Sequence, residues 1–355
     1  MNPSAHLARR SSLSSTLGLG EKLFSSARER RFAEAIEAGL DRVEAGLLAE
    51  VSFADNLADA TTRYLLEAGG KRVRPTLTLL TSQLGSGVSD DVITAAEAIE
   101  ITHLASLYHD DVMDEANMRR GVPSAQSVWG NSVAILTGDL LFARASKLIS
   151  GLGEQAIKVQ ADTFERLCLG QLHETIGPRE GEDPIEHYLQ VLADKTGSLI
   201  AASAQMGVIF GKAPVEYEQA VLDFGERIGI AFQLIDDVID LSAQAEVTGK
   251  AAGTDLRAGV ATLPLLFLRR DAETDADAAA LLVRIEHGVE NADVDDGTEF
   301  AAAVADLREH PVTRRTLDEA HRWAAEATAA LAPLPAGPVK KALTRFAETV
   351  VERSN

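Results

Sequence analysis

The chain is poor in cysteine, in aromatic residues and in long apolar runs. Cys168 is the only cysteine among 355 residues, which excludes an internal disulfide framework and fits a reducing, cytoplasmic location. We expect it to be a small core residue. Aromatic residues make up 5% of the chain and apolar residues 46%, a mixture that favours close-packed helices over sheets. No stretch of about 18 apolar residues is free of charge, so no transmembrane helix is expected.

Basic charge is also scarce. The chain has 34 basic and 54 acidic side chains, which gives a net charge of −20. Because a phosphate backbone requires a basic footprint, this balance argues against nucleic acid as a partner. An acidic balance is usually a solvated surface, unless the acids cluster at the spacing of metal ligands.

The composition changes near residue 31. Residues 1–31 are Ser-rich and locally basic, and we expect a poorly ordered tail, with an organellar transit peptide as the open alternative. Residues 32–355 show apolar residues at i, i+3, i+4 and i+7, which predicts one large all-α domain. Helices are expected over the following segments: Phe32–Val51, Asp90–Asp114, Ser132–Ser150, Ile185–Met206 and Val215–Leu241, with a helical connection over Asp271–Asp296.

Two acidic clusters have the spacing of metal ligands. Asp110, Asp111 and Asp114 close one predicted helix. Acids at i, i+1 and i+4 share one helix face and repel each other, an arrangement that a structural role does not need and a divalent cation does. Mg²⁺ takes one or two carboxylates and completes its shell with water and phosphate oxygens.

The second cluster repeats this spacing near the end of another apolar helix. It consists of Asp236, Asp237 and Asp240, and Gln233 lies one turn before Asp237. One such string in an acidic protein is weak evidence of a site, because solvated helix faces produce it by chance. Two strings, each ending a long apolar helix, favour a metal site.

Basic residues occur where phosphate groups would need partners. The turn Gly69–Pro75 carries Lys71, Arg72 and Arg74 and ends in a proline suited to starting a helix. Arginine can hold phosphate oxygens through two parallel hydrogen bonds, whereas lysine acts as a point charge. Further cations and polar groups follow at Arg119, Arg120, Lys195, Thr196 and Lys250. His103 shares a helix face with Asp110 and Asp114, and a satisfied core histidine is the alternative there.

Five strings together identify a resemblance. They are GGKRVRP, HLASLYHDDVMDEANMRRG, LADKTGSLIA, FQLIDDVID and GTDLRAGVATLP, collinear from Leu65 to Leu268. In this order they resemble the trans-isoprenyl diphosphate synthase family. The resemblance implies a single large antiparallel helical bundle with a central cavity, of the isoprenoid synthase type, and a homodimer. It also implies a prenyltransferase that joins isopentenyl diphosphate to an allylic diphosphate.

The resemblance assigns roles to the residues above. Mg²⁺, with Mn²⁺ as a substitute, would act through Asp110, Asp111, Asp114, Asp236, Asp237 and Asp240. Isopentenyl diphosphate would be bound by Lys71, Arg74, His103 and Arg120. The allylic diphosphate would be held by Arg119, Lys195, Thr196, Gln233 and Lys250, with Lys195 also stabilising the leaving charge.

Two positions depart from the family pattern. Val260 stands where the family often has a lysine, which puts one cationic contact in doubt. Gln171 stands where many members have an acid, although an amide can still join a water-mediated metal shell.

The residues before the first acidic cluster bear on product length. Ala105 and Ser106 lie about one turn before Asp110 and are small, which would leave the cavity open. We therefore expect a product longer than farnesyl: geranylgeranyl or longer, up to the side chain of a respiratory quinone. With so apolar a product, peripheral contact of the protein with a membrane is an open alternative.

Three other functions compete with this interpretation. A class I terpene cyclase would replace the second aspartate cluster with an Asn/Ser/Glu motif and would not need GGKRVRP. A non-catalytic subunit of a heteromeric prenyl synthase would tend to lose acids that are all present here. A calcium-binding structural protein would use loop ligands with glycine at fixed positions.

Overall fold

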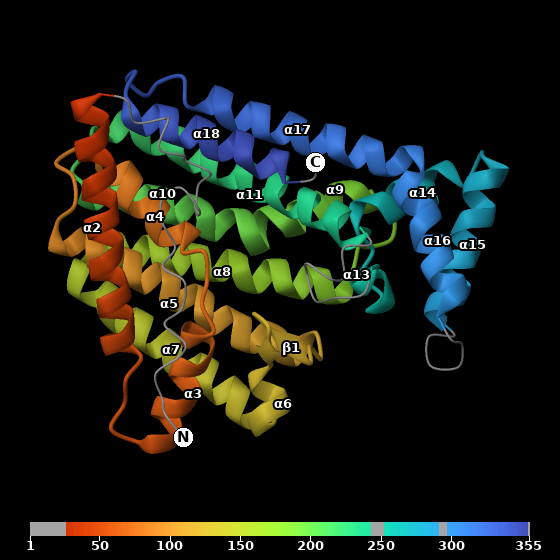
Figure 1. Ribbon diagram of the computed structural model, residues 1–355, viewed down its shortest axis with the longest axis horizontal. Coiled ribbons are helices and arrows are strands. Elements are labelled where there is room, and N and C mark those ends of the chain that lie inside the picture. The colour runs from red at the N-terminus through yellow and green to blue at the C-terminus, as the bar shows by residue number, and fades with distance from the viewer. Residues whose placement is uncertain (1–25, 243–251, 291–296, 354–355) are drawn as a thin grey trace. The chain divides into compact units, whose positions relative to one another are not determined.

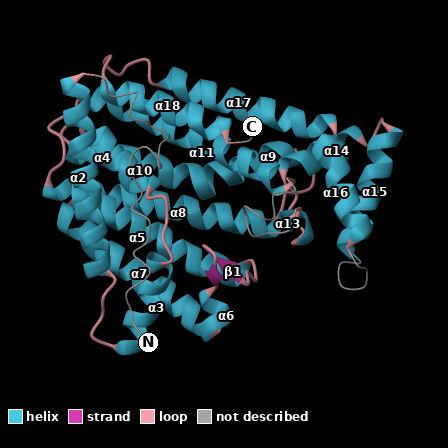
Figure 2. Ribbon diagram, in the orientation of Figure 1, coloured by secondary structure: helices cyan, strands magenta, loops and turns pink. Residues whose placement is uncertain are grey.

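The computed structural model describes residues 26–242, 252–290 and 297–353, and these fold almost entirely into helices (Figures 1 and 2). The all-α prediction is confirmed. The chain divides into two compact units, which are described separately. The first comprises Met1–Glu165, Leu199–Gly225 and Ala330–Phe346, and the second comprises Arg166–Ser198, Glu226–Ala329 and Ala347–Asn355.

The elements follow in chain order. They are α2 (Ala27–Glu50), α3 (Asn56–Glu67), α4 (Val73–Ser82), α5 (Asp90–Met113), β1 (Met118–Arg119), β2 (Val122–Pro123), α6 (Ala125–Trp129), α7 (Asn131–Leu152), α8 (Glu154–Ile176), α9 (Pro184–Leu192), a π-helix (Ala193–Gly197), α10 (Ser198–Phe210), a 3₁₀-helix (Val215–Tyr217), α11 (Glu218–Asp240), α13 (Thr254–Arg257), α14 (Leu263–Asp271), α15 (Ala276–Glu290), α16 (Thr298–Glu309), α17 (Pro311–Ala330) and α18 (Pro338–Glu352).

Helix α5 lies at the centre of the first unit. Ser89 caps its start by accepting a hydrogen bond from the backbone N–H of Val92, and two aspartates in the first turn favour the helix dipole. Most of its residues are buried, and it packs against α2, α4 and α7. Its last residue, Met113, lies one position before the predicted end, so the first acidic cluster sits at the C-terminal end of a buried helix.

Helix α2 begins earlier than the sequence predicts. Its first residue is Ala27 rather than Phe32, because Ser26 and Glu29 form a capping box. Lys341 of α18 adds an ion pair of 2.8 Å to Glu29. Residues 1–25 of the expected tail lie outside the described residues.

A short hairpin follows α5, where no strand was expected. Met118 pairs with Pro123 and Arg119 with Val122. Arg120 and Gly121 both have positive φ, of 53° and 79°, as a tight two-residue turn between antiparallel strands requires. The hairpin therefore fixes where the side chains of both arginines emerge.

The second unit has its own apolar core. It is built around residues such as Leu234 of α11, Leu263 and Leu268 of α14, and Val304 of α16. The predicted helix Ile185–Met206 is divided by the π-helix Ala193–Gly197. A Cβ atom on Gly229 would lie 2.5 Å from the Cα of Gly197, so α11 and the π-helix approach each other backbone to backbone.

The exposure of Cys168 and the polarity of the helices test two of the expectations. Cys168 is exposed, so its expected place in the core is wrong. Its position on the solvent side of α8 is a consequence of helix orientation that an apolar run alone does not reveal. Along the described ranges, every helix is too short or too polar to cross a bilayer.

Candidate active site

The first acidic cluster lies at the end of α5, and its members differ in exposure. Asp110 is half-buried, Asp111 is fully buried and Asp114 is exposed. Oδ1 of Asp111 accepts a hydrogen bond of 2.6 Å from Nε of Arg119, while the buried Oδ2 has no partner among the described residues. Burial raises the pKa of Asp111 and the charge of Arg119 opposes this. A buried carboxylate oxygen without a donor fits a hard cation such as Mg²⁺.

A cluster of arginines adjoins these acids within the first unit. The pKa of His103 is held well below its ordinary value by burial and then by the charges of Arg74, Arg120, Arg119 and Arg72. Burial lowers the pKa of Arg74 to about 10, with a contribution from Arg120. Nε of Arg74 is buried and unpartnered among the described residues. Concentrated positive charge around a neutral histidine is an environment for a multiply charged anion.

The structure thus brings together most of the residues predicted to bind isopentenyl diphosphate. Arg74 lies in the first turn of α4, His103 on α5, and Arg120 at the tip of the hairpin. Lys71 is exposed in the turn before α4. Arg119, predicted for the allylic diphosphate, connects this arginine cluster to Asp111.

The second acidic cluster ends α11 in the second unit, and protein groups contact each of its acids. Asp236 lies 3.2 Å from NH2 of Arg353. Asp237 is buried, and its Oδ2 accepts hydrogen bonds from the hydroxyl of Tyr188 at 2.8 Å and from the backbone N–H of Leu263 at 3.3 Å. Burial raises the pKa of Asp237 to about 8.

Asp240 is contacted by a backbone donor. Its Oδ2 accepts a hydrogen bond of 3.1 Å from the backbone N–H of Asp255. Gln233 is half-buried one turn before Asp237. Val260, the first departure from the family pattern, donates its backbone N–H to the carbonyl of Asp255. Lys250 lies outside the described residues.

Lys195 lies in the π-helix of the second unit. Its Nζ is 2.5 Å from Oε2 of Glu174, and both side chains are about three-quarters buried. Thr196 is half-buried beside it. The side-chain oxygen of Gln171, one turn before Glu174 on α8, is buried and unpartnered within the described part of the chain. The π-helix therefore presents Lys195 to an acid that the sequence argument did not identify.

The two predicted chain-length residues differ in environment. Ala105 is fully buried, and a Cβ atom on Gly138 of α7 would lie 3.2 Å from its carbonyl oxygen. Ser106 is half-buried, and its hydroxyl donates to the carbonyl of His103 at 2.9 Å. One turn deeper, buried Thr102 accepts a hydrogen bond of 2.8 Å from the amide of Gln160.

Sequence reasoning gave no role to the residues that hold these groups in place. Arg72, Glu174, Tyr188 and Arg353 each contact a predicted site residue or its turn. A signal existed for Glu174, since it lies one helical turn after Gln171. Tyr188 and Arg353 lie 49 and 117 positions from their aspartate partners, at 237 and 236, and nothing in their local sequence indicates the contact.

Neither acidic cluster is assembled as a metal cage. Within residues 26–242, 252–290 and 297–353, no three His, Cys, Asp or Glu side chains are gathered for an ion.

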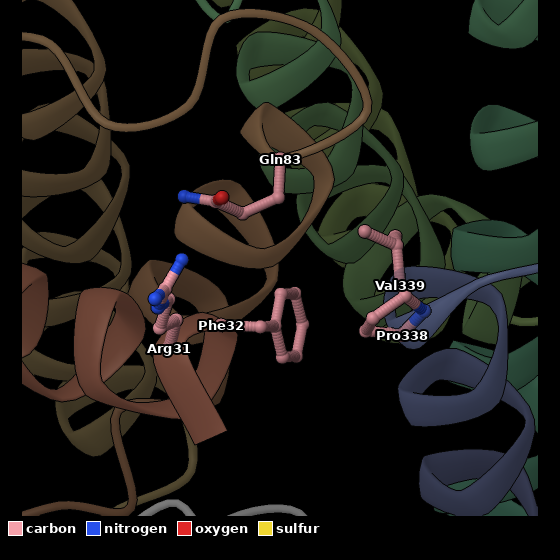
Figure 3. Close-up of a pocket in the computed structure, with 5 residues that line it drawn as sticks. All are labelled: Arg31, Phe32, Gln83, Pro338 and Val339. Atoms are coloured by element: carbon pink, nitrogen blue, oxygen red, sulfur yellow. The ribbon is translucent and has the colours of Figure 1, made fainter. Parts of the chain in front are cut away.

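A pocket of ≈ 240 Å³ in the first unit contains none of the predicted site residues. It is lined by Arg31, Phe32, Gln83, Pro338 and Val339 (Figure 3). Its wall combines a cation and an amide with three apolar side chains. It therefore does not belong to the candidate active site.

Comparison with known proteins identifies the family. Residues 55–299 match the model of the polyprenyl synthetase family. The nonaprenyl diphosphate synthase of Mycobacterium tuberculosis is 44% identical over 323 residues, which cover 91% of this chain and 94% of that protein. This match extends on both sides of the segment that carries the five motifs.

Solved structures agree in fold. A decaprenyl diphosphate synthase from Rhodobacter capsulatus has a TM-score of 0.80 at 32% identity, covering 92% of this chain and 99% of that one. A geranylgeranyl pyrophosphate synthase from Corynebacterium glutamicum, complexed with calcium and isoprenyl diphosphate, has a TM-score of 0.78 at 39% identity, covering 94% and 99%. This chain therefore belongs to the polyprenyl synthetase family and is a prenyltransferase, a polyprenyl diphosphate synthase.

Proposed function

We propose that this protein condenses isopentenyl diphosphate with an allylic diphosphate in trans and releases a product longer than farnesyl diphosphate. The observation that carries the proposal is the pairing of Arg119 with Asp111. Through it, an arginine cluster suited to an anion adjoins a carboxylate whose buried Oδ2 has no partner among the residues that the structure describes.

The arginine cluster binds the substrate that keeps its diphosphate. Lys71, Arg74, His103 and Arg120 hold isopentenyl diphosphate. The buried Nε of Arg74, which has no partner in the described part of the chain, supports this assignment. Arginine forks fix the phosphate oxygens in direction as well as in distance. The alkene is thereby held in position to attack.

The aspartates hold Mg²⁺, for which Mn²⁺ substitutes. We assign Asp110, Asp111, Asp114, Asp236, Asp237 and Asp240 as ligands, directly or through water, and their hard oxygen donors support this. The bound ions supply Lewis-acid stabilisation of the charge on the leaving diphosphate. The Corynebacterium glutamicum structure is complexed with calcium and isoprenyl diphosphate, which supports the use of a divalent cation.

The remaining polar residues hold the allylic diphosphate. We assign Arg119, Lys195, Thr196, Gln233 and Lys250 to this role. As charge grows on the leaving group, the ammonium of Lys195 gains more interaction energy than it had with the bound substrate. Glu174 keeps that ammonium in place through its 2.5 Å contact.

Product length follows from the small residues before the first cluster. Ala105 and Ser106 leave room for a chain longer than farnesyl. The names of the relatives, from geranylgeranyl to decaprenyl, support a product in this range.

The active form is a homodimer in the cytoplasm. Large apolar side chains are exposed in the first unit, with Ile135 and Leu136 on α7 and Ile157 and Phe164 on the part of α8 that precedes Arg166. Phe142 of α7 and Phe164 are in ring contact at 4.6 Å, which makes the two helices one surface. An exposed apolar surface of this kind supports association.

Product sizing tests the proposal. The protein is incubated with isopentenyl diphosphate, Mg²⁺ and each allylic primer from five to twenty carbons (about one to four isoprene units), and the dephosphorylated products are separated by reverse-phase chromatography. We expect products longer than farnesol and no turnover with chelator. Cyclised hydrocarbons, or no incorporation of isopentenyl diphosphate with any primer, would overturn the proposal.

A further inference from the structure

The segment that runs from the turn after α3 into the first turn of α4 carries three cations in unlike environments. Lys71 is exposed, Arg72 is only 5% exposed, and Arg74 has a buried Nε with no partner among the described residues. From the sequence alone, basic residues so close together would all be interpreted as phosphate ligands. Their different surroundings indicate that these three residues have different roles.

Arg72 is fully occupied by protein acceptors. Its Nε donates to Glu44 at 2.6 Å and its NH2 to the other Glu44 oxygen at 3.4 Å. NH1 donates to Glu100 at 3.2 Å and to the carbonyl of Gly69 at 3.5 Å, and NH2 also donates to the carbonyl of Leu66 at 3.3 Å. A guanidinium has five N–H donors, and these five contacts take up all of them.

These contacts hold a strained backbone. Arg72 has φ 50° and ψ 37°, a left-handed conformation that residues with a side chain adopt at a cost, and it stands at the N-cap of α4. Such a conformation persists only where its surroundings fix it. Arg74 follows two residues later, so the direction in which α4 presents Arg74 depends on the anchoring of Arg72.

Arg120 is attached to the same turn. Its NH1 donates to the carbonyl of Gly69, which Arg72 also contacts, and to the carbonyl of Leu65 at 2.8 Å. A Cβ atom on Gly70 would lie 2.5 Å from NH1 of Arg72 and 3.2 Å from NH2 of Arg120. Both arginines therefore meet the carbonyls at the C-terminal end of α3, where the helix dipole favours cations.

We propose that Arg72, held by Glu44 and Glu100, is the positioning residue of the site for isopentenyl diphosphate. It makes no contact with substrate. It sets the turn 69–74 so that Arg74 and Arg120 converge on one diphosphate group. This inference rests on the proposed function for the identity of the ligand.

Arg72→Lys tests the proposal, because lysine keeps the charge and cannot reach five acceptors in a plane. Isopentenyl diphosphate binding is measured by titration calorimetry, and steady-state kinetics gives both KM values and kcat. We expect Kd and KM for isopentenyl diphosphate to rise about tenfold or more, as misplacement of a binding group does. The KM of the allylic substrate and kcat at saturation should stay near wild type.

Glu44→Gln provides a second variant that leaves Arg72 in place. It weakens one anchor while Glu100 keeps the other, so we expect the same selective rise in KM, about threefold. In the Arg72→Lys background, Glu44→Gln should add no further rise, because both act through one side chain. Arg42→Lys is the matched control. Arg42 lies on α2, as Glu44 does, and pairs with exposed Asp90 at 2.6 Å.

The outcomes separate this inference from the proposed function. An unchanged Kd for isopentenyl diphosphate in folded Arg72→Lys overturns the inference, and if that variant does not fold, an unchanged Kd in Glu44→Gln does so. An equal loss in kcat and in both KM values also overturns it, because that is a general structural effect. If wild-type protein binds isopentenyl diphosphate without elongating any primer, the proposed function fails while the Kd comparison still decides the role of Arg72.

Discussion

The hydroxyl of Tyr188 donates a hydrogen bond of 2.8 Å to Oδ2 of Asp237. The backbone N–H of Leu263 contacts the same oxygen, so one carboxylate oxygen of Asp237 is held by two protein donors. Loss of a group that orients a metal ligand typically lowers metal affinity by about 10- to 100-fold. Tyr188 is therefore placed to control how Asp237 meets a cation.

Tyr188→Phe should raise the Mg²⁺ concentration for half-maximal activity about tenfold. Only the hydroxyl is lost, so the thermal transition should move little. Mg²⁺ titrations of activity, together with Mn²⁺ binding followed by electron paramagnetic resonance, measure the effect. Tyr217→Phe, in the 3₁₀-helix of the first unit, is the control. Unchanged metal dependence in Tyr188→Phe would show that the hydrogen bond does not orient a ligand.

Arg353→Gln should act in the opposite direction. Arg353 lies 3.2 Å from Asp236 and competes with a cation for that carboxylate. Since a partly exposed ion pair is worth ~0.2–1 kcal/mol, its removal should lower the required Mg²⁺ concentration by roughly 1.4- to 5-fold. The same titration measures it, with Arg314→Gln, whose partner Asp318 is exposed, as the control. A higher Mg²⁺ requirement in Arg353→Gln would contradict the competition.

Glu97→Gln should stabilise the protein at high pH. A Cβ atom on Gly46 of α2 would lie 1.8 Å from the Glu97 carboxylate, which is 8% exposed. Burial, with Glu50 adding and Arg42 opposing, raises the pKa of Glu97 from 4.5 to about 7. The folded state thus binds this proton more tightly than the unfolded state does. The stability that this tighter proton binding contributes is complete below pH 4.5 and is lost as the pH rises through 7.

The neutral amide avoids that loss. Thermal unfolding at pH 8 should show Glu97→Gln more stable than wild type by roughly 1–3 kcal/mol, and the difference should vanish near pH 4. Glu37→Gln, at an exposed position on α2, is the control. Equal stability of Glu97→Gln and wild type at pH 8 would show that Glu97 is charged at no cost.

Ala105→Phe should shorten the product. A ring at this position blocks a chain passing along α5 while leaving Asp110 a turn away. Because Ala105 is fully buried, the competing result is overpacking against a neighbouring helix, which costs ~1–3 kcal/mol. Product sizing and thermal unfolding distinguish the two. Lower stability with unchanged product length would mean that the growing chain follows another face of the helix.

The sequence predicted the helices that end in the two acidic clusters well, because apolar periodicity is encoded locally. Helix α5 lies within one residue of its predicted end, since its apolar run and the Ser89 cap agree. The hairpin was missed because two-residue strands carry no periodic signal. The π-helix was missed because it depends on the close approach of Gly197 and Gly229.

The different roles of the basic residues could not be predicted from the sequence. Arg72 and Arg74 lie two positions apart in one motif, yet one is consumed by Glu44 and Glu100 and the other keeps a buried, unpartnered donor within the described residues. Such a difference depends on acids 28 positions away in each direction. The difference between Arg72 and Arg74 arises only when α2 and α5 pack around the turn and bring Glu44 and Glu100 to Arg72.

The central claim is that the arginine cluster binds isopentenyl diphosphate while Lys195 acts on the leaving group of the allylic substrate. The most direct measurement is the steady-state kinetics of Arg74→Ala and Lys195→Ala with both substrates varied. We expect Arg74→Ala to raise the KM for isopentenyl diphosphate at least about tenfold with kcat largely kept. Lys195→Ala should lower kcat by about two orders of magnitude, as loss of one group that stabilises developing charge does. Interchanged effects of the two substitutions would contradict the account.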